Sequence, residues 1–254
     1  MSQTSRPVVL VSGVGRRVGI GAGVATRLAE DGWDVATTYW TAYDDRMPWG
    51  RHDADPGLVA EALRARGART VSVEADLSDP ASPARVLDTV QAELGDVTAL
   101  VMCHCESVDS GLLDTTVESF DRHYAVNVRA TWLLLKEYAQ RFTAAPGTGR
   151  VVAMTSDHVV GNLPYGATKG ALDRVVIGAA RELAHLRVSA NVVNPGPVDT
   201  WWITDDLREQ VRGLTPLGRN GTPADTAALV SFLLSPEGGW VNGQLLCSDG
   251  GLHV

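Results

Sequence analysis

A tyrosine and a lysine stand four positions apart in the stretch "MTSDHVVGNLPYGATKG", and a serine stands nine positions before the tyrosine. Residues i and i+4 share one face of a helix, so Tyr165 and Lys169 point the same way if this segment is helical. A nearby ammonium should lower the phenol pKa from about 10 toward neutrality, which makes tyrosine a usable general acid or base. Ser156 could then polarise a substrate oxygen while a cofactor moves a hydride.

A glycine-rich turn follows the first apolar run of the chain. The segment "SGVGRRVGIGAG" places glycines at positions 13, 15, 19, 21 and 23. Such a turn between a strand and a helix lets the backbone approach a pyrophosphate, whose charge the N–H groups and dipole of the helix stabilise. A tight turn without a ligand gives the same pattern. The position of this turn, after the first strand of an alternating α/β chain, favours a dinucleotide.

The residues at the end of the second apolar run bear on the choice of dinucleotide. A carboxylate there would hold the ribose 2′-hydroxyl of NAD, but this chain has Tyr39 and Trp40. Arg16 or Arg17 could pair with a 2′-phosphate, so we expect NADP(H) in preference to NAD(H). The alternative is that these arginines only solvate their loop. In the loop that follows, two arginines could add charge and two aspartates could oppose it: Arg46, Arg51, Asp44 and Asp45.

Short runs rich in β-branched residues alternate with segments of helical length and periodicity. The strand-like runs cover residues 7–12, 34–40, 70–75, 98–103, 150–156, 187–194 and 244–248. Among the helical segments between them, two long ones cover residues 117–142 and 165–186. This alternation predicts right-handed βαβ crossovers, and therefore an α/β fold whose parallel sheet is covered on both faces. Such a sheet binds ligands at the carboxyl ends of its strands. We expect one domain over residues 1–254, with its longest irregular piece at 41–56.

The composition narrows the class of partner. With 22 Lys and Arg against 30 Asp and Glu, the net charge of −8 argues against a nucleic-acid or anionic-membrane surface. Small molecules and other copies of the chain are the expected partners. The apolar runs are too short to span a bilayer, and the polar N-terminus enters a strand-like segment without a cleavable signal, so we expect a cytoplasmic protein. Three cysteines fit a reducing compartment.

The chain resembles the short-chain dehydrogenase/reductase family nearly end to end. The matching pieces are the glycine turn, "ADL" with Asp76 and Leu77, "AVNVRA" with Asn127, the Ser156–Tyr165–Lys169 set, "NPGPVDT" (194–200), "PLGRNGTP" (216–223) and "GQLLCSDGG" (243–251). Among its members the chain is similar to 3-oxoacyl-carrier-protein reductases, a similarity that does not identify the substrate. The resemblance implies a doubly wound Rossmann-type domain, a seven-stranded sheet of order 3-2-1-4-5-6-7, and homotetramers or homodimers assembled through the Tyr165 helix and the C-terminal strand.

The resemblance also implies a role for each matching residue. Tyr165 would donate or accept the proton, Ser156 would stabilise the carbonyl, and Lys169 would tune Tyr165 and hold the nicotinamide ribose. Asn127 would keep a water-filled proton relay open within its helix. Asp76 would contact the adenine, and Val198 and Thr200 the carboxamide. The full set of expected cofactor contacts is Gly13, Gly15, Arg16, Arg17, Gly19, Ile20, Tyr39, Trp40, Asp76, Leu77, His104, Lys169, Pro195, Gly196, Val198 and Thr200.

Two departures from the family pattern lie beside the expected site. The glycine turn is longer than the family's, so its register can start at Gly13 or at Gly15. The step from Ser156 to Tyr165 is shorter than the family's, so we expect a shortened loop. Because adjacent strand residues face opposite sides, only one of Thr155 and Ser156 can face the substrate, and alignment favours Ser156.

A third departure is the segment "MCHC", Met102 to Cys105, where the family usually has "NNAG". Thiolates and imidazole are ligands that zinc prefers. Consecutive residues on a strand cannot all converge on one ion, however, and no second pair is near in sequence, so we expect no metal. His104 either contacts the cofactor or simply fills space.

The segment after Pro195 and Gly196 falls where the family carries its mobile substrate lid, over residues 197–215. Trp201 and Trp202 could cover a substrate and exclude water, or could be buried in the packing of the lid or a subunit contact. Asp157 and His158 could provide polar recognition in the shortened loop.

Two functions are compatible with these patterns. The first is an NADP(H)-dependent oxidoreductase that interconverts a ketone or aldehyde and an alcohol. The second is a non-redox protein on the same scaffold, either a cofactor-binding module or a lyase or isomerase, which the altered "MCHC" segment and the shortened loop would favour. The intact Asn127, Ser156, Tyr165 and Lys169 set favours the first, because a binding module has no need of a tuned phenol.

Overall fold

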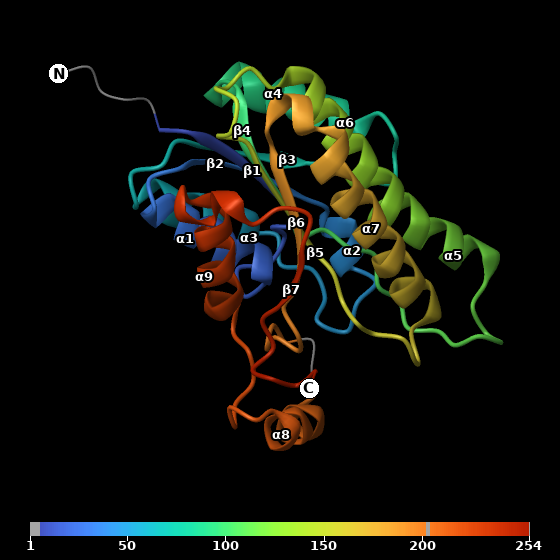
Figure 1. Ribbon diagram of the computed structural model, residues 1–254. Helices are drawn as coiled ribbons and strands as arrows, with labels where there is room; N and C mark the ends of the chain where they lie inside the picture. The colour runs from blue at the N-terminus through green and yellow to red at the C-terminus, as the bar shows by residue number, and fades with distance from the viewer. Residues whose placement is uncertain (1–5, 202–203, 254) are drawn as a thin grey trace.

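The strand-like runs of the sequence form one parallel sheet (Figure 1). The computed structural model describes residues 6–201 and 204–253. The strands are β1 (Val8–Ser12), β2 (Asp34–Tyr39), β3 (Thr70–Glu74), β4 (Val97–Met102), β5 (Arg150–Met154), β6 (Ser189–Asn194) and β7 (Leu245–Cys247). They lie in the order β3-β2-β1-β4-β5-β6-β7, which confirms the expected topology.

Helices cover the sheet on both faces, as the alternation of elements predicts. One face is covered by α1 (Ile20–Glu30), α3 (Asp55–Arg64) and α9 (Pro223–Leu234). The other is covered by α4 (Ser82–Leu94), α6 (Ala130–Arg141) and α7 (Leu163–Glu182), with α5 (Val117–His123) leading into α6. The remaining helical pieces are α2 (Thr41–Asp44), the π-helical η1 (Tyr124–Arg129), the 3₁₀ turns η2 (Ala184–Leu186) and η3 (Glu237–Trp240), and α8 (Asp205–Leu214). Figure 1 shows α8 apart from these layers, near the C-terminus.

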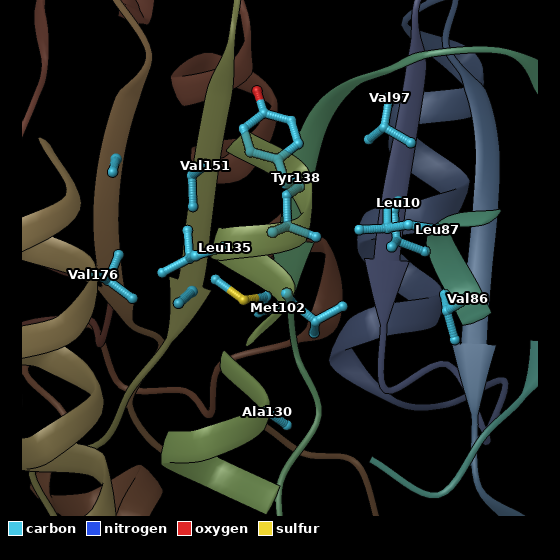
Figure 2. Close-up of a cluster of buried hydrophobic side chains, with 14 of the residues drawn as sticks. Leu10, Val86, Leu87, Val97, Met102, Ala130, Leu135, Tyr138, Val151 and Val176 are labelled. Atoms are coloured by element: carbon cyan, nitrogen blue, oxygen red, sulfur yellow. The ribbon is translucent and has the colours of Figure 1, made fainter. Parts of the chain in front are cut away.

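Strand β1 shows how the sequence divides the core between the two faces. Val8 and Leu10 pack into the cluster under α4, α6 and α7, whereas Val9 and Val11 pack into the cluster under α1, α3 and α9. Successive strand residues point to opposite faces, so a continuous apolar run is what a sheet buried on both faces requires. Figure 2 shows the first cluster, where Tyr138 lies beside Val151. The Tyr138 hydroxyl donates to the Thr98 carbonyl at 2.8 Å, which satisfies the polar end of this buried ring.

Three details differ from the sequence-based expectations. The piece expected to be irregular, 41–56, begins with the short helix α2. Helix α7 begins at Leu163, because Pro164 fits the first helical turn, where its missing N–H costs nothing. The long helix expected from residue 117 to 142 widens into a π-helical stretch at its centre. No helix in the described ranges is long and apolar enough to span a bilayer.

Candidate active site

A cavity of about 590 Å³ lies at the carboxyl ends of the strands. Each of the first six strands supplies lining residues where it ends, among them Gly13, Tyr39, Asp76, Cys103, Ser156 and Pro195. This is the place where doubly wound sheets bind their ligands. Most of the expected site residues line it: Gly13, Gly15, Arg16, Gly19, Ile20, Tyr39, Trp40, Asp76, Leu77, His104, Ser156, Tyr165, Pro195, Gly196, Val198 and Thr200. Arg17, Asn127 and Lys169 lie behind or beside the lining.

The glycine turn bends tightly beneath the end of β4. Gly13 has a φ of +76°, and a Cβ on it would lie 2.6 Å from the main chain of Cys103. A Cβ on Gly21 would lie 2.6 Å from the Gly13 carbonyl oxygen. Helix α1 begins at Ile20, after Gly19, and no side chain caps it. The turn therefore starts at Gly13, and the N-terminus of α1 at the cavity wall keeps its N–H groups available to an anion.

Ser156 is the hydroxyl that lies beside the phenol. Its side chain forms a hydrogen bond with Tyr165 and accepts the His158 N–H at 3.1 Å. Thr155 is buried, and its hydroxyl donates to the Lys169 carbonyl at 3.4 Å. Both residues line the cavity, so the expectation that only Ser156 faces the substrate stays a prediction.

Tyr165 and Lys169 share a face of α7, as their spacing predicts, but their electrostatics differ from the expectation. The Lys169 ammonium is buried, lies 5.4 Å from the centroid of the Tyr165 ring, and donates to the Met154 carbonyl at 2.8 Å. Burial raises the pKa of Tyr165 above its usual value, although the hydrogen bond with Ser156 lowers it. Burial also lowers the pKa of Lys169. The prediction that the ammonium brings the phenol pKa toward neutrality is therefore wrong for this arrangement, because burial raises that pKa instead.

Asn127 is fully buried within the π-helical stretch η1. Its side chain accepts the Glu106 N–H at 2.7 Å and donates to the Glu106 carbonyl and the Thr168 hydroxyl, both at 2.9 Å. Its main-chain carbonyl accepts the Thr131 hydroxyl at 2.8 Å. Asn127 thus ties the helix to the loop after β4 and to α7. The proton relay implied by the family resemblance stays a prediction.

The "MCHC" segment has a packing role at the back of the cavity. The His104 ring is buried, with Nδ1 2.6 Å from the Ser12 hydroxyl and Nε2 3.5 Å from that of Thr131. Burial lowers the pKa of His104 to about 3, so the ring is neutral. Burial raises the pKa of Cys103 to about 12, so it is a thiol at neutral pH. Within the described ranges, no group of three or more His, Cys, Asp or Glu side chains is placed to hold a metal ion.

The two arginines of the glycine turn occupy different environments. The Arg16 guanidinium lies over the Trp49 ring, 4.3 Å from its centroid, donates to the Thr200 carbonyl at 3.0 Å, and approaches Asp44 to 3.7 Å. Arg17 is largely exposed and lies 3.7 Å from Asp55, at the start of α3. Of the two, only Arg16 lines the cavity.

The loop after β2 closes over the loop after β4, and the sequence did not reveal this contact. The Arg46 guanidinium donates to both carboxylate oxygens of Glu106, at 2.8 and 2.9 Å, and the Tyr43 hydroxyl donates to the Ser107 carbonyl at 3.3 Å. Glu106 is 3% exposed and also lies 3.4 Å from Arg122. The sequence signal that could have revealed this contact is a glutamate shortly after an apolar strand. An acid in such a place is readily buried, and a buried carboxylate needs a cationic partner.

The segment expected to form the lid contains helix α8. Its Leu207 and Val211 line the cavity, and Val198 forms a bridge with Gly221. Trp201 has a φ of +65°, is 55% exposed, and is not among the residues that line the cavity. Trp202 lies outside the described residues.

The shortened loop from Ser156 to Gly161 packs directly on the start of α7. A Cβ on Gly166 would lie 2.2 Å from the His158 carbonyl oxygen, so only glycine permits this approach. The His158 ring then lies 6.4 Å, centroid to centroid, from the Tyr165 ring. Asn162, which the sequence reasoning missed, is buried, lines the cavity, and donates to the Ser107 hydroxyl at 2.9 Å.

Known proteins share this fold and these motifs. A family model described as enoyl-(acyl carrier protein) reductase matches residues 13–253. The uncharacterized oxidoreductase YjdA of Bacillus subtilis is 34% identical over 256 residues, which cover 99% of this chain and 98% of that protein. The NADPH-dependent aldehyde reductase-like protein of Arabidopsis thaliana chloroplasts is 31% identical over 255 residues, with 96% and 93% covered.

A solved structure agrees with these relatives. A short chain dehydrogenase from Burkholderia cenocepacia, crystallised in complex with NADP, superposes with a TM-score of 0.87 at 31% identity and covers 100% of both chains. The family model and these relatives cover the chain almost end to end, so the protein is an oxidoreductase-like member of the short-chain dehydrogenase/reductase family.

Proposed function

We propose that the protein is an NADP(H)-dependent oxidoreductase that interconverts a ketone or aldehyde and an alcohol. The observation that carries the proposal is the pairing of the Ser156 hydroxyl with the Tyr165 phenol in the wall of a cavity that also includes the glycine turn. A hydroxyl pair of this kind can hold a carbonyl oxygen from two sides and exchange a proton with it.

The residues of the cavity fit a dinucleotide. The uncapped N-terminus of α1 suits a pyrophosphate, and Gly13 lets the turn before it pack against the main chain of Cys103, where any Cβ would collide. Asp76 and Leu77 line the end beyond β3, where they would hold the adenine, and Val198 and Thr200 would hold the nicotinamide carboxamide. When bound, the nicotinamide supplies or accepts the hydride.

Tyr165 supplies the proton for the reaction, and Lys169 supplies a positive charge beside it. Because burial raises the pKa of Tyr165, the phenol is protonated at neutral pH and can donate its proton to a carbonyl oxygen during reduction. Ser156 donates a hydrogen bond to the same oxygen. The Lys169 ammonium, 5.4 Å from the ring centroid, stabilises the negative charge that develops on the phenol. The Met154 carbonyl holds that ammonium in place.

The preference for NADP(H) is supported by Arg16 at the cavity wall and by the NADP complex of the Burkholderia relative. Tyr39 and Trp40, at the end of β2, present no carboxylate to a 2′-phosphate. Asp44 opposes the preference, because its carboxylate lines the cavity 3.7 Å from Arg16.

The proposal is tested by following NADPH absorbance with a panel of ketones, aldehydes and alcohols. We expect Tyr165→Phe to lower kcat/KM by at least about a hundredfold, because the variant loses its proton donor, while the Kd for NADPH changes little. Tyr124→Phe is the matched control, because Tyr124 is exposed on η1 and should leave activity unchanged.

Two outcomes contradict the proposal. Full activity in Tyr165→Phe would remove the tyrosine from the mechanism. Tight NADPH binding by the wild type without turnover of any substrate would favour the non-redox alternative instead.

A further inference from the structure

The segment after β7 meets the loop that carries Ser156. The His253 ring lies between two carboxylates from distant parts of the chain. Its Nε2 is 2.7 Å from Asp157, directly after Ser156, and its Nδ1 is 2.6 Å from Asp249, after β7. His253 thus bridges two segments that the sheet topology does not join to each other.

Each of these carboxylates lies next to a residue of a different wall of the cavity. Asp157 adjoins Ser156, which pairs with the phenol of Tyr165. Asp249 packs against Gly196, since a Cβ on that glycine would lie 2.5 Å from the Asp249 Cβ. Gly196 lines the cavity after β6, and its N–H donates to the Asn194 side chain at 3.1 Å. The bridge therefore connects the wall with the reactive hydroxyls to the wall at the end of β6.

The Asp249 carboxylate is held in place by hydrogen bonds and can accept another from an imidazole. It accepts the N–H of Gly251 and the N–H of His253, each at 3.0 Å, in addition to the His253 ring. Burial acts to raise the pKa of Asp249, but these hydrogen bonds outweigh it, so the pKa lies below its ordinary value. The carboxylate is ionised at neutral pH and its position is fixed by the backbone of the tail.

The other polar groups around His253 come from the two neighbouring strands. The Asn194 amide, at the end of β6, lies 3.5 Å from Nε2. The Cys247 thiol, in β7, interacts electrostatically with both Asp157 and Asp249, and burial raises its pKa, so it carries no charge at neutral pH. Among these groups, only the two carboxylates can therefore balance a positive charge on the imidazole.

The protonation state of His253 decides how many of its contacts are attractive. An imidazolium donates one N–H to each carboxylate, whereas a neutral imidazole has one donor and one acceptor nitrogen. The neutral ring would turn a lone pair toward one carboxylate, and that contact would be repulsive. The charged form of the ring therefore completes both sides of the bridge, whereas the neutral form completes only one.

We propose that His253 is a positioning residue for the reaction: it holds the Ser156 loop against the Gly196 turn, and it does so most firmly when its imidazole is protonated. This inference rests on the proposed function, because it assigns the Ser156 loop a part in carbonyl reduction. It gives the C-terminal tail a role at the substrate end of the cavity that is independent of the Tyr165–Lys169 pair.

The first test compares His253→Ala and His253→Gln with the wild type between about pH 5.5 and pH 8.5. For His253→Ala at the acid end of this range we expect kcat/KM to fall about five- to tenfold, with little change in the Kd for NADPH. The deficit should be largest where the wild-type imidazole is charged, because the neutral ring completes only one side of the bridge. His253→Gln keeps one donor, so its kcat/KM should be intermediate and its extra pH dependence absent. His185→Ala, at an exposed histidine in η2, is the matched control.

Two results of this test would overturn the inference. The first is a kcat/KM of the variants equal to that of the wild type at every pH. The second is a loss of activity that follows a loss of thermal stability equally at every pH, because this would show a purely structural role.

A second measurement separates the inference from the proposed function. In ¹H–¹⁵N spectra at about pH 5.5, both ring N–H protons of His253 should be hydrogen-bonded in the wild type, and Asp157→Asn should weaken the Nε2–H bond alone. If the wild type reduces no carbonyl but both bonds are present, the proposed function fails and the bridge remains. If the wild type is active but these signals are missing, the inference about His253 fails by itself.

Discussion

The side chains of Arg16 and Asp44 together set the charge at the end of the cavity where a 2′-phosphate would bind. Arg16 is held over the Trp49 ring and lies 3.7 Å from the Asp44 carboxylate, which accepts the Trp49 indole N–H at 2.8 Å. Burial raises the pKa of Asp44 above its ordinary value, which favours its neutral form. A 2′-phosphate would be attracted by the arginine and repelled by the aspartate to the extent that the latter is ionised. The ratio of the affinities for NADPH and NADH therefore measures the balance of these two residues.

We expect Arg16→Ala to raise the Kd for NADPH by about tenfold relative to the Kd for NADH, because only NADPH loses a charged partner. Asp44→Asn should shift the ratio the other way. Both constants can be measured by fluorescence titration, and the ratio cancels any effect common to the two cofactors. Arg17→Ala is the control, because Arg17 pairs with Asp55 beside the cavity. An equal change for both cofactors in Arg16→Ala would contradict the assignment.

At the scale of residues, the sequence placed Tyr165 and Lys169 together but did not predict their electrostatics. The spacing of Tyr165 and Lys169 was enough to place them on one helix face, because helical periodicity is local. The direction of the Tyr165 pKa shift depends on burial, and the Lys169 side chain is held by the Met154 carbonyl. That carbonyl comes from β5, across the fold, so no local pattern announces it. For the same reason the Arg46–Glu106 pair, which joins the loops after β2 and β4, was not foreseen.

Helix α7 and the loop before it fit together through one glycine. Gly166 faces the His158 carbonyl, and any larger residue must push the Ser156 loop away. Gly170, one turn later, has nothing within 4 Å of an added Cβ. We therefore expect alanine at these two glycines of α7 to have opposite effects on stability.

We expect Gly166→Ala to destabilise the protein by about 1–3 kcal/mol, because the added methyl group cannot fit without moving the loop. Its kcat should fall more than its Kd for NADPH rises, because Ser156 moves with the loop. Gly170→Ala should instead stabilise the protein by about 0.5–1 kcal/mol, because alanine favours a helix and meets no obstacle. Urea unfolding monitored by circular dichroism gives both free energies of unfolding. Equal stability of the two variants would contradict the proposed packing of the loop.

At the scale of elements, the strands were predictable from the sequence, but the π-helical stretch η1 and the short helix α2 were not. Every strand-like run became a strand within two residues of its expected limits, because burial on both faces requires continuous apolar runs. The π-helical stretch at Asn127 depends on hydrogen bonds to Glu106 and Thr168, which lie outside its own helix. Helix α2 is likewise anchored by tertiary contact, since the Thr41 hydroxyl donates to Glu74 at 2.5 Å.

The sheet as a whole ends at β7, which leaves one edge without a neighbouring strand. Three large apolar side chains near this edge are exposed: Trp240 at 98%, Phe232 at 45% and Leu245 at 45%. An exposed edge strand beside apolar side chains is a surface that proteins normally cover. The family resemblance implies assembly through the C-terminal strand, and these side chains give that expectation a physical basis.

We expect the wild type to be a homo-oligomer in solution, because burying a tryptophan of about 150–250 Å² stabilises a contact by on the order of 4 kcal/mol. The double variant Trp240→Ser, Leu245→Arg should dissociate to a smaller species, because it removes this apolar surface and places a charge on the edge strand. Light scattering coupled to gel filtration measures the masses. Leu58→Ser is the control, because Leu58 is exposed on α3, which packs near β3 at the opposite edge of the sheet. A wild type that is monomeric at micromolar concentration, or a double variant of unchanged mass, would show that this edge is not an interface.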